Sequence, residues 1–352
     1  MGDNAAVESD DEILEIVDQS PEALYELFEQ RGWGDGLPMV PPTSQRVEEA
    51  LGNVDGDPEE PVAVLSPRGG VATRRAVAVN AVLAGCRPEY LPVVLTTIRA
   101  LGQQQVNLRG VNATTHPAAP LSIVHGEVVE QLGFNSGLGA FGPGNRANAT
   151  VGRAIRLVLL HVGGARPGPG DASTQGQPSK YTYCVAENSE ESPWEPYHRW
   201  AGVDSPSAVT VHCGENPHNF HDMESDGIER ILDKAASTMA TFGVNNACIS
   251  GGEWFICLCP EHAAVADSAG WGREEVADYL FAHARRPASE FRSQFDRLAW
   301  ADWMKDAEDE ELLPMTQEVT NIKVFVTGGA GKHSCVIPSW GMTRSVTLPV
   351  ES

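Results

Sequence analysis

The sequence has few lysines, no long apolar run and no evident set of paired cysteines, and each shortage narrows what the chain can be. Nowhere among the 352 residues do about eighteen apolar residues follow one another, so no segment predicts a transmembrane helix. The opening segment, MGDNAAVESDDEILEIVDQS, is acidic where a secretory signal peptide would be basic and then apolar. We therefore expect a cytoplasmic protein with no membrane partner.

Lysine is scarce in a chain that is strongly acidic. Only five of the 25 basic residues are lysines, and 48 acidic residues bring the net charge to −23. Such a charge repels itself at low salt, whereas at about 1 M salt the Debye length falls to about 3 Å and the repulsion is screened. We interpret the composition as adaptation to a salty cytoplasm such as that of a haloarchaeon; the alternative is an acidic protein from a GC-rich genome. Nucleic acids and anionic membranes are poor partners for this protein, because its net negative charge repels them.

The seven cysteines are an odd number spread over the whole chain, which does not indicate a disulfide framework. Two of them, Cys257 and Cys259, lie in the apolar run FICLC, where residues two apart share one face of a strand. We expect both to be buried thiols, because free cysteine is most often a small core residue.

Helical and strand patterns alternate along the chain, which predicts a mixed α/β fold. Ser20 followed by Pro21 indicates a helix start within a helical segment from 11 to 31, and Thr43 or Ser44 caps a helix that runs through Leu51. Further helices are predicted within 72–101, with a break at 87–88, and at 149–162, 224–242, 261–269, 273–285 and near 289–312. Strands are predicted at 61–65, 121–126, 181–186, 209–213, 253–259, 323–329 and 345–350.

We divide the chain into three parts: an acidic helical segment over 1–31, a first α/β lobe with Gly/Pro-rich loops over 32–207, and a second α/β lobe with the C-terminal strands over 208–352. Two segments suggest a weak internal repeat, because each is an apolar strand that leads into a helix: LSIVHGEVVEQLGF and WFICLCPEHAAVADSAGW. Two related lobes around a central cleft would place a site between them.

The first candidate site is FGPGNRANATVGRA, residues 141–154. Gly142 and Gly144 allow close backbone approach, and Asn145 or Asn148 can cap the following helix, whose N-terminus suits an anion. Arg146 and Arg153 add charges that can grip a carboxylate or phosphate. The alternative is a Gly-Pro turn feeding a helix, and the spacing matches no nucleotide-binding motif.

The second is VFVTGGAGKHSC, residues 324–335. Gly329 and Gly331 lie in a turn after a strand, followed by Lys332, His333, Ser334 and Cys335, which are donor, base and nucleophile types. These residues are candidates for catalysis and substrate contact, against the alternative of a structural loop.

Three further groups are weaker candidates. His116 in TTHP could serve as an acid or base, and Asp35 in WGDGLP is either a catalytic carboxylate or a turn former. The segment CGENPHNFHD contains Glu215, His218, His221 and Asp222, a composition that could hold a metal or be a polar loop. The sequence indicates no cofactor.

Several long segments resemble one family of uncharacterised prokaryotic proteins: DGLPMVPPT, AVNAVLAGCRPEYLPVVL, GFNSGLGAFGPGNRANATVGRA, SPWEPYH and GGAGKHS. The resemblance extends from about residue 31 to the end. Members of that family resemble the large partner of small UGSC-type proteins, which carry a Sec/Cys-Gly-Ser-Cys motif. The resemblance implies an enzyme, or half of one, working with a partner's reactive thiol or selenol. This chain has no Cys-Gly-Ser-Cys of its own.

We therefore expect an enzyme, an oxidoreductase or lyase, that binds a small anionic substrate between the lobes. His333 or His116 would transfer a proton, while Arg146 and Lys332 would neutralise the substrate from opposite sides. The alternatives are a metal-dependent hydrolase using His218, His221 and Asp222, and a non-catalytic scaffold or carrier subunit. The sequence does not determine the oligomeric state, and a homo-oligomer is possible.

Overall fold

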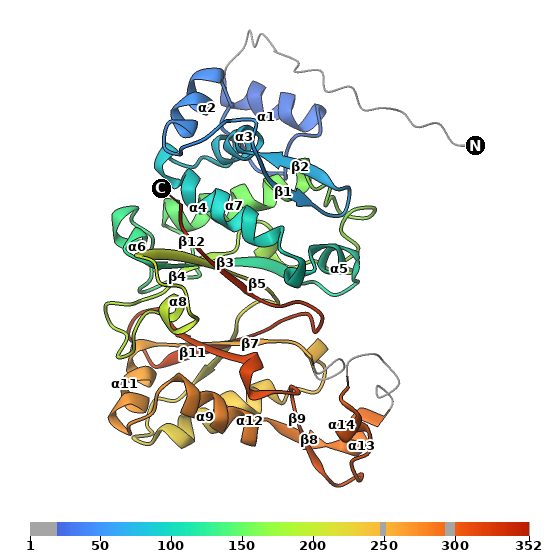
Figure 1. The fold of residues 1–352 in the computed structure, drawn as a ribbon, viewed down its shortest axis with the longest axis vertical. Coiled ribbons are helices and arrows are strands. Elements are labelled where there is room, and N and C mark those ends of the chain that lie inside the picture. Colours follow the sequence, from blue (N-terminus) through green and yellow to red (C-terminus); the bar gives the residue numbers. More distant parts are fainter. Residues whose placement is uncertain (1–19, 247–250, 293–299, 352) are drawn as a thin grey trace, which may run out of the picture.

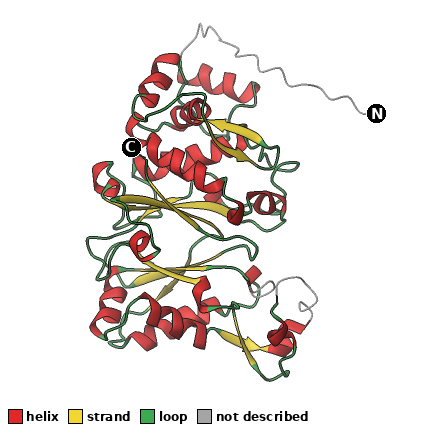
Figure 2. Ribbon diagram, in the orientation of Figure 1, coloured by secondary structure: helices red, strands yellow, loops and turns green. Residues whose placement is uncertain are grey.

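Two four-stranded sheets lie one above the other in the middle of the molecule, and helices cover the outer face of each (Figures 1 and 2). The computed structural model describes residues 20–246, 251–292 and 300–351. The first sheet has the order β12-β5-β3-β4 and the second the order β10-β7-β11-β6. Both mix parallel and antiparallel neighbours, so the predicted mixed α/β fold is confirmed.

The first sheet is formed by β3 (Ala119–Gly126), β4 (Cys184–Ala186), β5 (Ser207–Gly214) and β12 (Val346–Pro349). Helices α4 (Leu91–Leu101) and α7 (Arg146–His161) pack on it, and α3 (Arg74–Ala84) packs on them. Around this layer lie α1 (Pro21–Gln30), α2 (Ser44–Leu51), the hairpin β1 (Pro61–Leu65) and β2 (Gly70–Thr73), and the short helices α5 (Leu108–Ala113), α6 (Val128–Gln131) and α8 (Tyr197–Trp200).

The second sheet is formed by β6 (His218–His221), β7 (Trp254–Leu258), β10 (Ile322–Val326) and β11 (His333–Pro338). Its outer face carries α9 (Ile228–Met239), α11 (Pro260–Ser268) and α12 (Arg273–His283). A small appendage follows, with the strand pair β8 (Arg285–Pro287) and β9 (Leu312–Pro314) and the helices α13 (Ala288–Phe291) and α14 (Asp302–Lys305).

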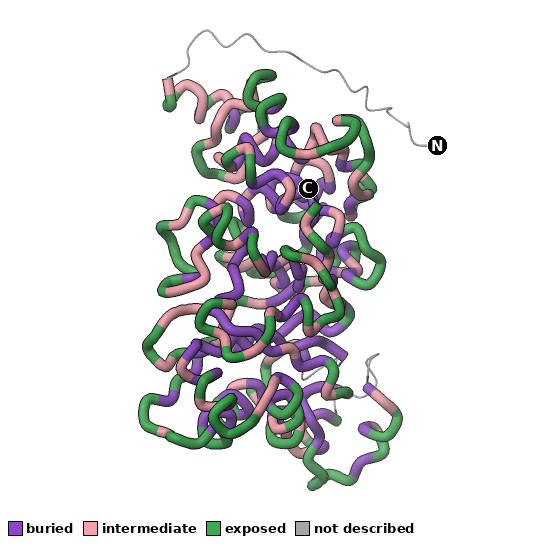
Figure 3. Tube along the Cα trace, turned by 60° about the vertical axis from the view of Figure 1, so that its left-hand side comes forward, coloured by how far each residue is buried: buried purple, intermediate pink, exposed green. Residues whose placement is uncertain are grey.

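An apolar layer joins the two sheets. Alternate residues of β3, among them Leu121 and Ile123, belong to the same buried cluster as Phe255 of β7 and Phe325 of β10. Because strand side chains alternate between faces, one face of each sheet supplies this layer and the other packs on helices. Buried segments accordingly run through both sheets and the helix faces against them (Figure 3). Most of the space between the sheets is thus filled by side chains.

The sheets do not follow the expected division of the chain at 207/208. β5 and β12, both assigned to the second lobe from the sequence, pair within the first sheet, where β5 lies between β3 and β12. The chain passes to the second sheet after Gly214 and returns to the first through β12.

The long acidic helix expected near 289–312 is wrong for the described residues. Only α13 and α14 are helical there, residues 293–299 lie outside the description, and Leu312 already begins β9. Phe291 and Leu313 are fully buried in the apolar cluster of the second half, and this packing, rather than one continuous helical face, organises the segment.

The six described cysteines are free, whereas Cys248 lies outside the described residues. Cys257 and Cys259 are buried, as expected, but they do not share a strand face, because β7 ends at Leu258 and Cys259 precedes α11. Among the described residues, no helix has the length and apolar character needed to span a membrane.

Candidate functional site

The two glycine-rich loops that we expected to share a site contact each other. The backbone N–H of Gly328 donates to the carbonyl of Ser136 at 2.8 Å. Gly329 approaches the other loop so closely that a Cβ there would lie 2.8 Å from the backbone nitrogen of Leu138. The segment before α7 and the segment before β11 therefore form adjoining walls.

A cavity of about 370 Å³ lies between these walls, and we call it the Cys335 pocket. Its lining consists of residues 138–142, Pro217, Asn219, Cys257, 327–331 and 333–335. Of the predicted site residues it includes Gly142, Gly329, Gly331, His333 and Ser334. The volume falls within the range typical of small-molecule sites, which is about 300–1,000 Å³.

Three strands of the second sheet place polar side chains at this pocket. In the register of β11, Cys335 lies opposite Asn219 of β6 on one side and Cys257 of β7 on the other. His333 is two residues from Cys335 and therefore on the same face of β11. Its Nδ1 lies 3.0 Å from Oδ1 of Asn219, and its ring stacks on His221 with 5.2 Å between centroids.

The two thiols in the pocket belong to residues that lie opposite each other on neighbouring strands, although they differ in exposure. Cys257 is 2% exposed, whereas Cys335 is half-buried and is the thiol that a ligand can reach. Burial, followed by the proximity of Cys335, raises the pKa of Cys257 well above its ordinary value. Cys257 therefore stays protonated beside the accessible thiol.

Ser334 has its hydroxyl on the opposite face of β11. Its Oγ accepts the N–H of Cys259 at 3.0 Å and lies 2.8 Å from Nδ1 of His262. The other ring nitrogen of His262 lies 3.2 Å from the carbonyl oxygen of Asp222. Burial lowers the pKa of His262, so its ring is a neutral acceptor for the serine hydroxyl. The arrangement fixes α11 to the sheet, and Ser334 is at the same time one of the residues that line the pocket.

Arg146 and Lys332 do not lie on opposite sides of one anion-binding pocket, as the sequence predicted. Lys332 has a left-handed backbone, with φ of 52°, and its Nζ donates to the carbonyl of Met223. Arg146 donates to the carbonyl of Gly85 and lines a separate cavity of about 180 Å³. Neither side chain lines the Cys335 pocket.

The other residues predicted to bind an anion also have their polar groups engaged by other parts of the chain. Asn145 caps α7 by accepting the N–H of Asn148, and Gly144, with φ of 113°, supplies the turn before it. Arg153 is bound by both oxygens of Asp35 at 2.8 Å each. In the described structure these residues hold the loops to α7.

His116 lies against Glu215, with 2.8 Å between Nε2 and Oε1. Its Nδ1 accepts the N–H of Ala118, so Nε2 carries the proton that Glu215 accepts. The pair contacts neither His333 nor Asp35 through any hydrogen bond in the described chain, so the sequence candidates do not converge on one reaction centre.

The metal centre proposed from His218, His221 and Asp222 is not supported by the geometry. His218 and His221 are three apart in β6 and therefore lie on opposite faces of the strand. Asp222 is buried and engaged by Ser225 and Lys234. Among the described residues these three do not come together as a group of metal ligands.

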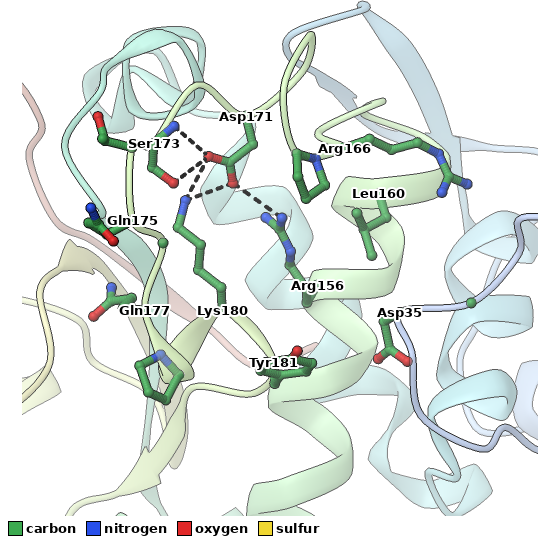
Figure 4. A pocket seen from close by; sticks show the side chains of 15 residues that line it. Asp35, Arg156, Leu160, Arg166, Asp171, Ser173, Gln175, Gln177, Lys180 and Tyr181 are labelled. Carbon is green, nitrogen blue, oxygen red and sulfur yellow. Dashed lines mark hydrogen bonds and ion pairs between the residues drawn. The ribbon is translucent and has the colours of Figure 1, made fainter.

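A larger cavity of about 760 Å³ was missed from the sequence, and we call it the Asp171 pocket (Figure 4). Both oxygens of Asp171 accept from Nζ of Lys180 at 2.8 and 2.7 Å, and Arg156 reaches the same carboxylate at 3.2 Å. Ser173 adds two further bonds. Figure 4 shows Lys180, Arg156 and Ser173 converging on this carboxylate from the loop and from α7.

Charge within the Asp171 pocket differs in sign from the chain as a whole. Its lining includes three cationic side chains, those of Arg156, Arg166 and Lys180. It includes two carboxylates, those of Asp35 and Asp171, and Asp35 is already paired with Arg153 outside the pocket lining. Burial lowers the pKa of Lys180, which Asp171 partly opposes. The one available sequence signal was Lys180 itself, one of only five lysines, within a Gly/Pro/Ser-rich stretch.

No family model matches this chain, and a search of curated proteins finds no significant match either. The two pockets are therefore the features of the molecule from which a function can be inferred.

Proposed function

We propose that this chain is a cytoplasmic enzyme that reduces a small disulfide or a similarly thiol-reducible compound in the Cys335 pocket. One observation carries the proposal: a half-buried thiol and a buried thiol contact each other across neighbouring strands at the floor of a ligand-sized pocket. Accessible and buried partners match the two successive roles of a reducing dithiol, attack on substrate and resolution of the intermediate.

The reaction would proceed in two exchanges. The thiolate of Cys335 attacks one sulfur of the substrate disulfide, the substrate S–S bond breaks, and one substrate thiolate leaves and takes up a proton. Cys257 then attacks the sulfur of Cys335 and passes its proton to the second substrate sulfur, which leaves as a thiol, so that a Cys257–Cys335 disulfide remains. Two electrons pass from the protein dithiol to the substrate.

His333 would support the first exchange. It lies on the same strand face as Cys335, and Asn219 holds its Nδ1, which leaves Nε2 to exchange protons with the reacting sulfur. A second dithiol or thiol–selenol must reduce the chain for the next turnover, and the small partner implied by the family resemblance would be of this chemical class.

A trapping experiment tests the proposal. The fully reduced chain is mixed at molar KCl with oxidised glutathione or cystine, and thiol release and protein mass are followed. We expect wild type to release two thiols per chain, Cys257→Ser to stop at a mixed disulfide on Cys335, and Cys335→Ser to be inert. Cys86→Ser, which changes a half-buried cysteine elsewhere, is the matched control.

Two results would oppose the proposal. One is a wild-type chain that neither releases thiol nor acquires the substrate adduct. The other is a Cys335→Ser variant that reacts like wild type. A scaffold that only presents a thiol protein would give the first result.

A second candidate function is binding of a small anionic substrate in the Asp171 pocket. The observation in its favour is the excess of cationic side chains there in a chain of net charge −23. Lys180 would be a cationic contact for the substrate anion beside Arg156. Calorimetric titration with inorganic phosphate, comparing wild type with Lys180→Met, tests it.

We expect Lys180→Met to weaken phosphate binding by at least about tenfold, because one charged contact is lost. Lys305→Met, at a lysine on α14 outside this pocket, should bind like wild type. Equal affinity of wild type and Lys180→Met would remove this candidate.

A further inference from the structure

We propose that His125, Glu187 and His198 form a binding site for one divalent transition-metal ion of the zinc type. The three residues are 0–1% exposed, and one ligand atom from each lies within 4.8 Å of the others. They come from three segments: the end of β3, the residue after β4 and helix α8. None of them lines either pocket described above.

His198 supplies the decisive observation. Its Nε2 lies 2.9 Å from the carbonyl oxygen of Ser205, which can only accept, so Nε2 carries the proton. Nδ1 is then left with a lone pair, and this buried atom has no hydrogen-bond partner among the described residues. A buried acceptor without a donor is rare and calls for a ligand.

His125 has the orientation of a second ligand. Its Nε2 lies 2.8 Å from Oγ1 of Thr210, and its Nδ1 lies 2.7 Å from Oε2 of Glu187. Metal-binding histidines commonly donate the far ring N–H to an oxygen, which fixes the ring and the tautomer. Thr210 serves this purpose for His125, as Ser205 does for His198.

Glu187 is a fully buried carboxylate already held in place. The N–H of Tyr197 donates to both oxygens, and Arg273 reaches Oε1 at 3.3 Å. Arg273 also donates to the carbonyl of Glu195 at 2.7 Å. The guanidinium thus contacts one carboxylate oxygen, while the other faces the two imidazoles.

The donor set selects the class of ion. Two imidazole nitrogens and one carboxylate oxygen suit zinc and neighbouring transition metals, whereas calcium and magnesium prefer oxygen ligands throughout. Three protein ligands also suit a site that keeps one position for a water molecule. Because the cluster is buried, the ion would be taken up during folding.

Metal analysis of the refolded full-length chain tests the site. The protein is unfolded with a chelator, refolded at molar KCl with Zn²⁺, desalted and analysed for zinc per chain. We expect about one zinc in wild type and less than about a tenth of that in His198→Gln and Glu187→Gln. His212→Gln is the matched control, because His212 is equally buried, neither of its ring nitrogens has a hydrogen-bond partner within the described residues, and it lies outside the cluster.

Refolding with Co²⁺ keeps the test decisive if the variants fail to fold. A tetrahedral cobalt site in wild type gives visible absorption bands, and zinc should displace them. Wild type without stoichiometric zinc and without these bands overturns the proposal. So does a folded His198→Gln that retains full zinc, because the ion would then be held elsewhere.

Discussion

Arg153 of α7 and Asp35 of the loop after α1 form an ion pair with two parallel hydrogen bonds of 2.8 Å. The Asp35 side chain is 4% exposed and that of Arg153 is 14% exposed, so the pair is largely shielded from water. Arg153 also donates to the carbonyls of Leu37 and Pro38. One guanidinium therefore fixes the whole loop against the helix.

Replacing Asp35 by Asn should lower the free energy of unfolding by about 3 kcal/mol, because a shielded arginine would lose its counterion. Burial alone would raise the pKa of Asp35, but Arg153 holds this pKa below the ordinary 3.8. A lowered pKa stabilises the fold above the unfolded-state value and loses that effect as pH falls. Denaturant unfolding should thus show the gap between wild type and Asp35→Asn narrowing below about pH 4. Asp55→Asn, at an exposed site, should show no such gap.

Asn148 should be a positioning residue for the Cys335 pocket. Its buried amide accepts the N–H of Asn135 and donates to the carbonyls of Asn135 and Ala140, which anchors the 138–142 wall. We expect Asn148→Ala to lose about 2–3 kcal/mol of stability and to slow the reaction with a small disulfide. Asn145→Ala, which removes the helix cap and the exposed hydrogen bond from Nδ2 to the carbonyl of Gly133, should lose about 1–2 kcal/mol. Urea unfolding and the thiol-release assay measure both effects. Unchanged reactivity of folded Asn148→Ala would contradict the positioning role.

The fold should become more stable as KCl rises into the molar range, because the net charge of −23 repels itself at low salt. Thermal melts at low and high KCl measure this. A melting temperature that is flat or falls with salt would rule out adaptation to a salty cytoplasm.

Phe255→Ala should destabilise both sheets together. Phe255 is fully buried in the layer between the sheets, and truncating a buried phenylalanine costs about 3–5 kcal/mol. We expect one cooperative transition at a lower denaturant midpoint, followed by circular dichroism and by tryptophan fluorescence. Val64→Ala, at a 62% exposed position of β1, is the control. Two separate transitions in wild type would show that the layer does not couple the sheets.

Helix starts could be predicted from the sequence because capping chemistry is local. Ser20 and Thr43 accept backbone N–H groups at the beginnings of α1 and α2, as their sequence context indicated. Strands β6 and β11 were not predicted, because their polar residues become a strand pair only when β7 and the loops around them supply partners. The contact between Cys257 and Cys335 depends on that register, so no spacing in the sequence could indicate it.

The same limit applies to the candidate residues. Lys332, Arg146 and Arg153 were singled out by residue type beside glycines, but side-chain direction depends on backbone geometry and on carbonyls supplied by distant segments. The His125 cluster combines residues that are remote in sequence, and only the assembled first sheet brings them together. The Asp171 pocket draws mainly on residues 156–181, but their convergence depends on how the loop after α7 folds back on that helix.

The route of the chain also has a consequence for folding during synthesis on the ribosome. β12 pairs with β5 at the edge of the first sheet, yet every other described strand and helix is synthesised before it. Until β12 emerges, β5 has an open edge whose free backbone groups can pair with another chain. A nascent chain therefore passes through a period in which the second half is present while the first sheet is incomplete, and a chaperone or molar salt would matter most in that interval.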